Sequence, residues 1–496
     1  MQIKNFLTSR IVQIAGAAVL FFGAGVLVTA LAVPAGAVTG QPLKVEVSAD
    51  ARQGFTAIGN MQAAFREISR KVLPSVVEID VVDVVKQTVP SFQSPFDFFF
   101  GTPHSTAPQQ REFRQEGLGS GVIVRQAGGR VYVLTNNHVV NNADEITVVL
   151  PDKRRFRATV TGKDDRKDLA LVSFPAAGTF PVATLGDSDT VQTGDWVIAV
   201  GNPLGFESTV TEGIISAVGR RPQPGTDIAG YTDYFQTDAA VNRGNSGGAL
   251  VNIEGEVIGI NTWIASPSGG SIGLGFAIPI NNAKKAVEQF ITKGKVAYGW
   301  LGIAGNDISA GARTDLGVGD AAGALVTGVY SNSPAAQAGL LPGDFITAVN
   351  GRSVQDMTGL ALAVGDLSSG ARARLDVIRQ GAPVTLSVAI VEKPDATAMK
   401  NADLWPGLSV VKITSDIRSQ LNLPAGAGGL VIGRVDQGST AQATGFRAGD
   451  IIKTVNNRPV NDLRGFYAAV NDLSRSRVMF RLTRDSGDVI LALERR

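Results

Sequence analysis

The residue best suited to nucleophilic chemistry is Ser246, which lies in the run Gly244-Asn245-Ser246-Gly247-Gly248. Glycines on both sides let the backbone turn tightly, so that neighbouring N–H groups can point at one spot and stabilise an oxyanion. The chain has 58 glycines, and by itself such a run is also compatible with a plain turn between strands. A serine nucleophile needs a base, so the histidines decide between the two interpretations.

Two histidines are present in the whole sequence. His104 lies in a polar, proline-bearing stretch typical of a loop. His138 follows an apolar, β-branched run that starts at Tyr132, and Asn136 and Asn137 directly precede it. We therefore expect His138 at the end of a buried strand, where the orientation of its imidazole can be fixed. A buried histidine with a purely structural role is the alternative.

The third member should be a carboxylate that holds the imidazole in one tautomer and stabilises the imidazolium. Asp168 is the best candidate because it opens an apolar strand. Asp164 and Asp165 lie in a charged turn, and we expect them to be solvated loop charges. The chain order His138, Asp168, Ser246 is that of chymotrypsin-like proteases, whereas subtilisin-like and α/β-hydrolase enzymes use other orders.

The blocks TNNHVV, DLALV and TDAAVNRGNSGGALVN around these residues resemble the HtrA/Deg family of serine proteases. The resemblance runs from about Asn60 to the C-terminus. It implies a mainly β fold: a chymotrypsin-like double six-stranded antiparallel β-barrel with the active site between the barrels, followed by two PDZ domains, which are small β-barrels with helices. It also implies a serine endopeptidase that uses no cofactor.

The proposed mechanism proceeds through an acyl-enzyme. Ser246 attacks the peptide carbonyl, His138 takes its proton and later protonates the leaving amine, and Asp168 orients His138. The oxyanion loop consists of Gly244, Asn245 and Ser246, and the N–H groups of Gly244 and Ser246 are the expected donors.

Substrate preference is partly encoded in the sequence. The position six before the nucleophile is Ala240, so no buried carboxylate awaits a Lys or Arg side chain. The segment that contains Ile264 and Ala265 resembles the family's pocket wall, which implies a preference for small or β-branched aliphatic residues.

Activation must differ from that of digestive proteases, which carry an aspartate directly before the nucleophile to pair with a new N-terminus. Asn245 cannot form that ion pair, so loop rearrangement is the simplest source of activation. The resemblance implies that Arg220 relays PDZ or partner signals to the oxyanion loop. There are two alternatives: Arg220 is a surface arginine with no signalling role, or Arg221 has the relay role in its place.

The overall composition excludes several classes of protein. A net charge of +2 over 496 residues gives no reason to expect nucleic acid as a partner. The chain has no cysteine, which excludes disulfides, thiol catalysis and cysteine-based metal sites. Two histidines argue against a histidine-rich metal centre, so we expect neither a metal nor a cofactor.

The first 37 residues form an N-terminal signal or anchor segment. Its apolar run Ile11–Val33 has 23 residues and follows two basic residues. A run of this length can span a bilayer, whereas the core of a signal peptide is typically ~7–15 residues long. Small residues up to Ala37 nevertheless offer a cleavage site. Retention as an inner-membrane anchor and cleavage near Ala37 both export the rest of the chain, and the resemblance implies the periplasm.

Changes of pattern divide the remaining chain. We predict a linker over 38–59, a protease domain over 60–296, a first PDZ domain over 299–393 and a second over 405–496. Residues 61–72 show helical spacing, and short β-branched runs then alternate with turns up to about Pro279. The PDZ boundaries follow from an internal repeat, in which Gly343-Asp344 recurs as Gly449-Asp450.

An insertion over 86–116 contains Pro, Gln and Ser together with clustered phenylalanines, among them Phe98, Phe99 and Phe100. Clustered phenylalanines in a loop need a partner to leave water. In the HtrA family this position carries a regulatory loop that takes part in self-assembly. We therefore expect a homo-oligomer, by resemblance a trimer or a multiple of trimers. Packing of the loop on its own barrel is the alternative.

PDZ domains bind the ends of extended peptides by adding a strand to a sheet edge, with backbone N–H groups around the terminal carboxylate. By resemblance, Trp300-Leu301-Gly302-Ile303 is the carboxylate loop of the first domain. The matching loop of the second domain contains Pro406, which removes one donor, so peptide binding there stays open.

The predicted function is degradation of unfolded or damaged exported proteins, with control by PDZ binding and oligomerisation. Unfolded polypeptides and peptide C-termini are the expected partners. Two alternatives remain. One is a dedicated stress sensor that cuts a single membrane substrate, and the other is a chaperone or binding scaffold.

Overall fold

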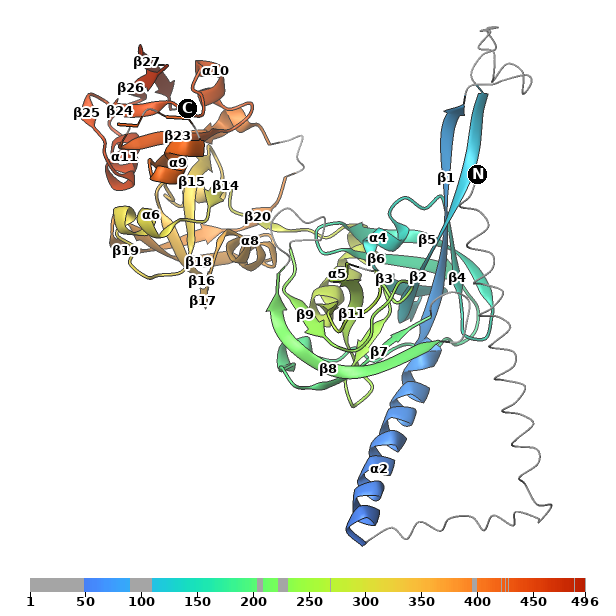
Figure 1. Cartoon of the computed structure of the whole chain (residues 1–496). Coiled ribbons are helices and arrows are strands. Elements are labelled where there is room, and N and C mark those ends of the chain that lie inside the picture. The colour runs from blue at the N-terminus through green and yellow to red at the C-terminus, as the bar shows by residue number, and fades with distance from the viewer. Residues whose placement is uncertain are drawn as a thin grey trace, which may run out of the picture. The chain divides into compact units, whose positions relative to one another are not determined.

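The computed structural model describes residues 49–89, 109–202, 208–221, 231–267, 269–394 and 399–495, except positions 421, 424, 427 and 486 (Figure 1). The predicted N-terminal segment 1–37 lies outside these ranges. The chain divides into two units, Met1–Ala63 and Ala64–Arg496. Within the described ranges, no helix is both long and apolar enough to cross a bilayer.

The first described element is helix α2 (Ala49–Val72), which runs across the boundary of the two units. Its start lies within the predicted linker 38–59, of which residues 49–59 are helical. This stretch has no proline, and its two glycines cost a helix only ~1 kcal/mol each relative to alanine. The helix ends before the 3₁₀ turn Leu73–Ser75, where Pro74 stands, as the sequence indicated.

Two closed six-stranded antiparallel barrels follow, which confirms the predicted fold class. The first has the order β1-β2-β3-β6-β5-β4 and the second the order β10-β11-β12-β9-β8-β7. The strands of the first are β1 (Val76–Val89), β2 (Gln109–Ala127), β3 (Arg130–Thr135), β4 (Glu145–Val149), β5 (Arg155–Asp164) and β6 (Leu169–Pro175). Those of the second are β7 (Trp196–Gly201), β8 (Thr209–Arg220), β9 (Tyr234–Thr237), β10 (Ala249–Val251), β11 (Val257–Ile264) and β12 (Gly275–Pro279).

Strand β6 shows how the barrels share their cores. Because side chains alternate along a strand, Leu169 and Leu171 join one apolar cluster with residues of the second barrel and of helix α5 (Ile280–Lys293). Ala170 and Val172 face the interior of the first barrel. The first four residues of β6, Leu169 to Val172, are apolar and buried on both faces, and they fix the position of the residue that precedes them.

The insertion expected as a loop over 86–116 is strand at both ends. Strand β1 continues to Val89, β2 begins at Gln109, and these two residues pair. The two ends extend the pairing of β1 with β2, which runs without a break from Val76–Val122 to Val89–Gln109. Phe98, Phe99 and Phe100 lie outside the described residues.

Two PDZ domains with the same topology complete the chain. The first sheet has the order β14-β15-β16-β18-β19 with β17 paired to β16, and the second has β22-β23-β24-β26-β27 with β25 paired to β24. This identical order confirms the duplication that the sequence repeat indicated. The elements of the first domain are β13 (Gly299–Trp300), β14 (Ile303–Asn306), α6 (Ala310–Leu316), β15 (Ala324–Tyr330), α7 (Pro334–Gln337), β16 (Phe345–Val349), β17 (Arg352–Ser353), α8 (Met357–Gly365), β18 (Arg372–Arg379), β19 (Ala382–Ala389) and β20 (Val391–Glu392). Those of the second are β21 (Leu404–Trp405), β22 (Leu408–Lys412), α9 (Ser415–Gln420), β23 (Leu430–Val435), α10 (Thr440–Thr444), β24 (Ile451–Val455), β25 (Arg458–Pro459), α11 (Leu463–Val470), β26 (Arg477–Arg484) and β27 (Gly487–Glu494).

Candidate active site

Asp168 stands directly before β6 with a left-handed backbone (φ +55°). Its carbonyl oxygen accepts hydrogen bonds from the Asn136 side chain (3.0 Å) and from the Asn137 N–H (3.2 Å). These bonds tie the end of β3 to the start of β6. They hold the Asp168 backbone in a conformation that a residue other than glycine rarely adopts.

His138 lies in the short helix α4 (Asn137–Val140), just after β3. Its backbone N–H donates to Asp168 Oδ1 (2.9 Å), and its ring Nδ1 lies 2.8 Å from Asp168 Oδ2. A carboxylate only accepts, so the proton is assigned to Nδ1, which leaves Nε2 free to act as a base. The imidazole is half exposed and the carboxylate is 15 % exposed, so the base faces solvent and substrate while its partner is shielded.

Thr262 is a third donor to this carboxylate, and sequence reasoning missed it. Its Oγ1 donates to Asp168 Oδ2 at 2.7 Å. Thr262 lies in β11, where the register against β12 shifts between Asn261 and Trp263, and such irregularities redirect a side chain. The signal in the sequence is a pair of polar residues, Asn261 and Thr262, inside an otherwise apolar strand.

The hydroxyl of Ser246 is bonded to a backbone carbonyl and not to the base. Its Oγ donates to the carbonyl oxygen of Thr262 (2.9 Å), and no hydrogen bond joins it to His138, although both residues lie in the described ranges. The acid–base pair is therefore assembled, whereas the hydrogen bond between nucleophile and base is not formed in this structure.

The turn around Ser246 depends on its glycines. Gly244 has φ +95° and Gly247 has φ +85°, and a Cβ on Gly247 would lie 2.1 Å from the carbonyl oxygen of Ser120. The N–H of Asn245 donates to Asn242 (3.0 Å), so Asn245 supplies no oxyanion donor here, contrary to its place in the predicted set. The N–H groups of Gly244 and Ser246 have no acceptor within the described part of the chain and remain the candidate donors.

Ser120, a fully buried residue of the first barrel, fastens this turn. Its N–H donates to the carbonyl of Ser246 (2.8 Å), and its Oγ donates to the carbonyl of Gly244 (2.6 Å). The same Oγ accepts from the Asn202 N–H (2.9 Å). Sequence analysis missed Ser120, because nothing local indicates a contact with a residue more than a hundred positions away.

The predicted specificity residues lie beside the nucleophile turn. Ala240, Ile264 and Ala265 are each half-buried. Trp263 stacks on Phe276 with ring centroids 3.8 Å apart, which makes a rigid aromatic layer next to this wall.

Tyr234 meets Trp263 edge-on at 5.8 Å. Burial raises the pKa of Tyr234, and the Asp168 carboxylate raises it further. Tyr234 is therefore a neutral phenol at physiological pH and adds no charge beside the carboxylate.

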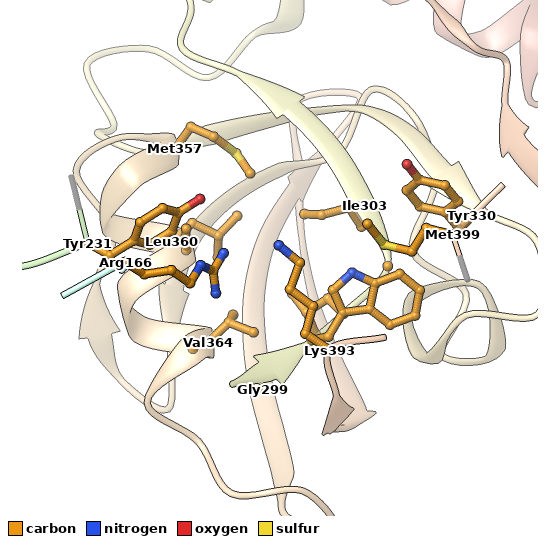
Figure 2. A pocket seen from close by; sticks show the side chains of 15 residues that line it. Arg166, Tyr231, Gly299, Ile303, Tyr330, Met357, Leu360, Val364, Lys393 and Met399 are labelled. Carbon is orange, nitrogen blue, oxygen red and sulfur yellow. The ribbon is translucent and has the colours of Figure 1, made fainter. Parts of the chain in front are cut away.

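The carboxylate loop predicted for the first PDZ domain lines a cavity of about 200 Å³ (Figure 2). Loop residues Trp300–Ile303 meet helix α8 across it, and Met357 and Leu360 are among the α8 side chains that line it. Gly302 has φ +84°, and a Cβ there would lie 2.2 Å from the Cβ of Ser333. The loop therefore requires glycine at this position.

The corresponding groove of the second PDZ domain is covered. Its groove residues Leu408, Val410, Phe466 and Tyr467 are all less than 5 % exposed. They belong to one apolar cluster together with Leu316 and other residues of the first PDZ domain.

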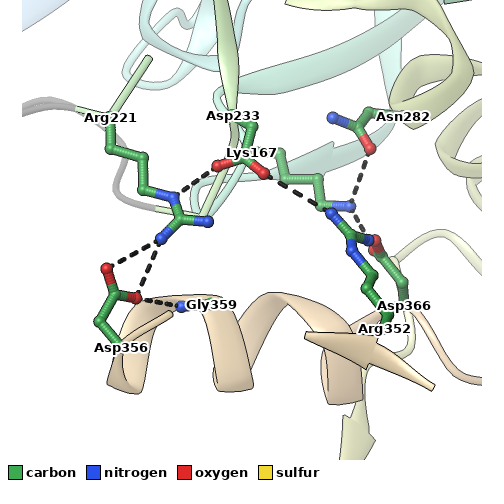
Figure 3. Close-up of polar contacts among 8 residues, drawn as sticks. All are labelled: Lys167, Arg221, Asp233, Asn282, Arg352, Asp356, Gly359 and Asp366. Carbon is green, nitrogen blue, oxygen red and sulfur yellow. Dashed lines mark hydrogen bonds and ion pairs between the residues drawn. The ribbon is translucent and has the colours of Figure 1, made fainter. Parts of the chain in front are cut away.

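Polar contacts join both ends of α8 to the protease domain (Figure 3). Asp356, which caps the start of α8, accepts from Arg221 Nη1 (2.9 and 3.0 Å). Asp366, at the end of α8, accepts from Lys167 Nζ (2.8 Å). Arg220, the predicted relay, is exposed and donates to Gln236 (3.0 Å). The structure thus brings Arg221, the alternative, to the PDZ domain.

Asp164 corrects a second prediction. It is only 4 % exposed and accepts a hydrogen bond from the Tyr298 hydroxyl, so it is not a solvated loop charge. Burial raises the pKa of Asp164, while the bond from Tyr298 and the charge of Lys167 lower it. The reason for the miss is tertiary, because Tyr298 is 134 positions away in the sequence. Within the described ranges, no group of three or more His, Asp or Glu side chains is placed to hold a metal ion.

Comparison with known proteins agrees with this geometry. Residues 119–260 match the trypsin-like peptidase domain family and residues 299–390 the PDZ domain family. The periplasmic serine endoprotease DegP of Salmonella typhimurium is 36% identical over 443 residues, which cover 85% of this chain and 90% of that protein. DegP of Escherichia coli is 37% identical over 414 residues, 79% of this chain and 84% of that protein.

Solved structures show the same relationship. A variant of the HtrA-type protease AlgW with a decapeptide is 38% identical and superposes with a TM-score of 0.55, covering 68% of this chain and 99% of that one. AlgW itself with a decapeptide is 39% identical, with a TM-score of 0.54. Fold, domain order and extent of identity together show that this chain belongs to the HtrA/DegP family of serine endopeptidases.

Proposed function

We propose that this protein degrades unfolded polypeptides in the periplasm, and that a peptide C-terminus bound to its first PDZ domain switches it on. One observation carries the proposal. Three donors hold the Asp168 carboxylate in place beside His138, while the Ser246 hydroxyl is bonded to Thr262 instead of His138. An enzyme that is one side-chain rotation from competence is suited to control by a ligand.

In the active state Ser246 Oγ rotates toward His138 Nε2 and attacks the peptide carbonyl as the imidazole takes its proton. The imidazolium that forms is stabilised by the Asp168 carboxylate and then protonates the leaving amine. A water molecule, activated by the same imidazole, hydrolyses the acyl-enzyme and regenerates Ser246. Thr262 positions the carboxylate throughout, because its hydroxyl donates to Asp168.

The developing oxyanion is stabilised by the N–H groups of Gly244 and Ser246. Removal of one such donor typically lowers turnover ~10²–10³-fold, so the shape of this turn contributes to the rate together with the triad. Ser120 supports the turn through its two bonds to Gly244 and Ser246. We infer that cleavage follows small or β-branched aliphatic residues, because Ala240 offers no charge to a basic side chain.

The first PDZ domain is the proposed receptor. Its loop and α8 line an open cavity, and both ends of α8 are bonded to the protease domain. Lys167, which binds one end, is 5 % exposed and directly precedes Asp168. A peptide that changes the position of α8 therefore acts on the residue next to the triad carboxylate. The AlgW structures named with a decapeptide support peptide binding in this family.

Periplasmic location rests on the names of the relatives, which are periplasmic serine endoproteases, together with the apolar run at the N-terminus. Whether that run is retained or cleaved near Ala37 does not change the side of the membrane on which the enzyme acts. Self-assembly through the 86–116 insertion is part of the proposal by family resemblance.

Digestion of a denatured protein by the full chain, with and without a peptide that ends in a free apolar residue, tests this function. We expect cleavage that peptide stimulates and that Ser246→Ala abolishes. Cleavage of one membrane protein alone, with all denatured substrates left intact, would favour a dedicated sensor. Binding of denatured protein with no cleavage would favour a scaffold.

A further inference from the structure

One charged turn of the protease domain borders the peptide cavity of the first PDZ domain. The guanidinium of Arg166 lies 4.1 Å from the ring centroid of Tyr231 and 4.5 Å from that of Tyr298. A cation held between two aromatic rings is stabilised by both. This stacking fixes Arg166 at the rim of the cavity, where Arg166 and Tyr231 are among the lining residues.

The positive charge of Arg166 is not neutralised by a carboxylate within the described part of the chain. Lys393, from the end of the first PDZ domain, lines the same cavity. In Figure 2 both cationic groups point into the space beside α8. The remaining lining is largely apolar, with Ile303 and Val364 among its members. The cavity therefore offers an apolar surface together with two cations.

We propose that this cavity selects peptide C-termini that carry an acidic side chain within the last few residues, and that Arg166 of the protease domain binds that side chain. The inference rests on the proposed role of the first PDZ domain as a peptide receptor. A strand added to the edge of β14 directs alternate side chains to opposite sides. Those that face the α8 groove also face Arg166, because Arg166 lines the same cavity.

The position of Arg166 gives this contact a consequence for catalysis. Arg166 is two residues before Asp168. Its neighbour Lys167 bonds to Asp366 of the first PDZ domain, and Asp164 bonds to Tyr298, directly before that domain. A peptide bound to both the PDZ domain and Arg166 contacts the turn that carries the triad carboxylate. Such a ligand favours one geometry of the turn to the extent that it binds that geometry more tightly.

The test measures peptide binding to the full chain carrying Ser246→Ala, by fluorescence anisotropy. The probes are labelled ten-residue peptides that end in valine, with Glu or Gln placed at each of the three preceding positions in turn. At one position we expect Glu to bind about fivefold more tightly than Gln, as for a favourable solvent-accessible ion pair. Arg166→Gln should remove this preference, and Arg166→Lys should retain part of it.

Arg220→Gln is the matched control, because it removes an arginine that does not line the cavity, and the preference should survive. Thermal melting confirms that each variant is folded. The inference is overturned if Glu and Gln peptides bind equally to the parent chain, or if the preference persists in Arg166→Gln. It is also overturned if only Lys393→Gln removes it. If none of the peptides binds the parent chain, the receptor role of the first PDZ domain itself fails, which is a separate result.

Discussion

The two PDZ domains share one topology, yet the groove of the first is open and the groove of the second is buried. In the first, Ile303 and Ala361 are partly exposed and line an open cavity. At the equivalent positions of the second, Leu408 and Tyr467 are buried against the first domain. The comparison indicates that a single fold serves as a receptor in one copy and as a structural joint in the other. Side chains on the same backbone elements make the difference.

The joint has several independent components. Leu316 of α6 is 4 % exposed and belongs to the apolar cluster of the second domain. Asp315 accepts from Lys412 Nζ at 2.7 Å, and Arg464 lies against Gly317. Strand β21 also pairs with β15 of the first domain. A cavity of about 470 Å³ remains open between the domains, and the groove residue Val410 is among the residues that line it.

The largest effect on this comparison is expected from Leu316→Ala. Removal of a buried leucine side chain typically costs ~2–5 kcal/mol, and here the loss falls on the joint between the two PDZ domains. Hydrogen exchange measured by mass spectrometry should show faster exchange in α11, because that helix loses its cover. Leu473→Ala is the control, since Leu473 is 72% exposed and its removal should change exchange little. If the protection of α11 is unchanged in Leu316→Ala, packing of Leu316 does not stabilise the joint between the two PDZ domains.

The second-largest effect is expected on peptide affinity, when the equivalent glycines of the two carboxylate loops are each replaced by alanine. Gly302 and Gly407 have φ of +84° and +74°, and a Cβ on either would clash with Ser333 or Ser439. Left-handed backbone costs a residue with a side chain ~1–2 kcal/mol, and the clash adds to this, so Gly302→Ala should lower peptide affinity at least about tenfold.

Gly407→Ala should leave peptide affinity unchanged, because the groove residues of the second PDZ domain are buried against the first. Anisotropy titrations of the same peptide against both variants make the comparison. Equal losses in the two variants would mean that both loops bind peptide, and the contrast between the domains would then be wrong.

The smallest effect is expected at the edge of the joint. The Lys412–Asp315 ion pair has a lysine side chain that is 46% exposed, and ion pairs of this kind typically contribute ~0–1 kcal/mol. Lys412→Ala should therefore change the exchange of α11 much less than Leu316→Ala does. A larger effect of Lys412→Ala than of Leu316→Ala would show that the ion pair, and not apolar packing, is the main stabilising contact of the joint.

The sequence was informative where function depends on local pattern. His138 and Asp168 stand at ends of strands rich in apolar residues, and such strands can be predicted from short apolar runs and turn residues. The barrels and the PDZ duplication follow from the same signals together with family resemblance. The strand ends of the 86–116 insertion were missed because their residues are mostly polar and become strand by pairing with each other.

What the sequence could not provide is non-local. Thr262 and Ser120 reach the site through tertiary contacts, and Asp164 is buried only because Tyr298 covers it. The rotamer of Ser246 is set by competition between two acceptors, which no motif encodes. Closure of the second PDZ groove likewise depends on a surface of the neighbouring domain.

Labelling with a fluorophosphonate probe tests the central claim most directly, namely that Ser246 is the nucleophile and is held back until peptide binds the first PDZ domain. The probe reacts covalently with an activated serine, and mass spectrometry locates the adduct. We predict slow labelling of the full chain at Ser246, at least about fivefold faster labelling with an apolar C-terminal peptide, and none in Ser246→Ala. Labelling that is equally fast without peptide, or that survives in Ser246→Ala, would contradict the account.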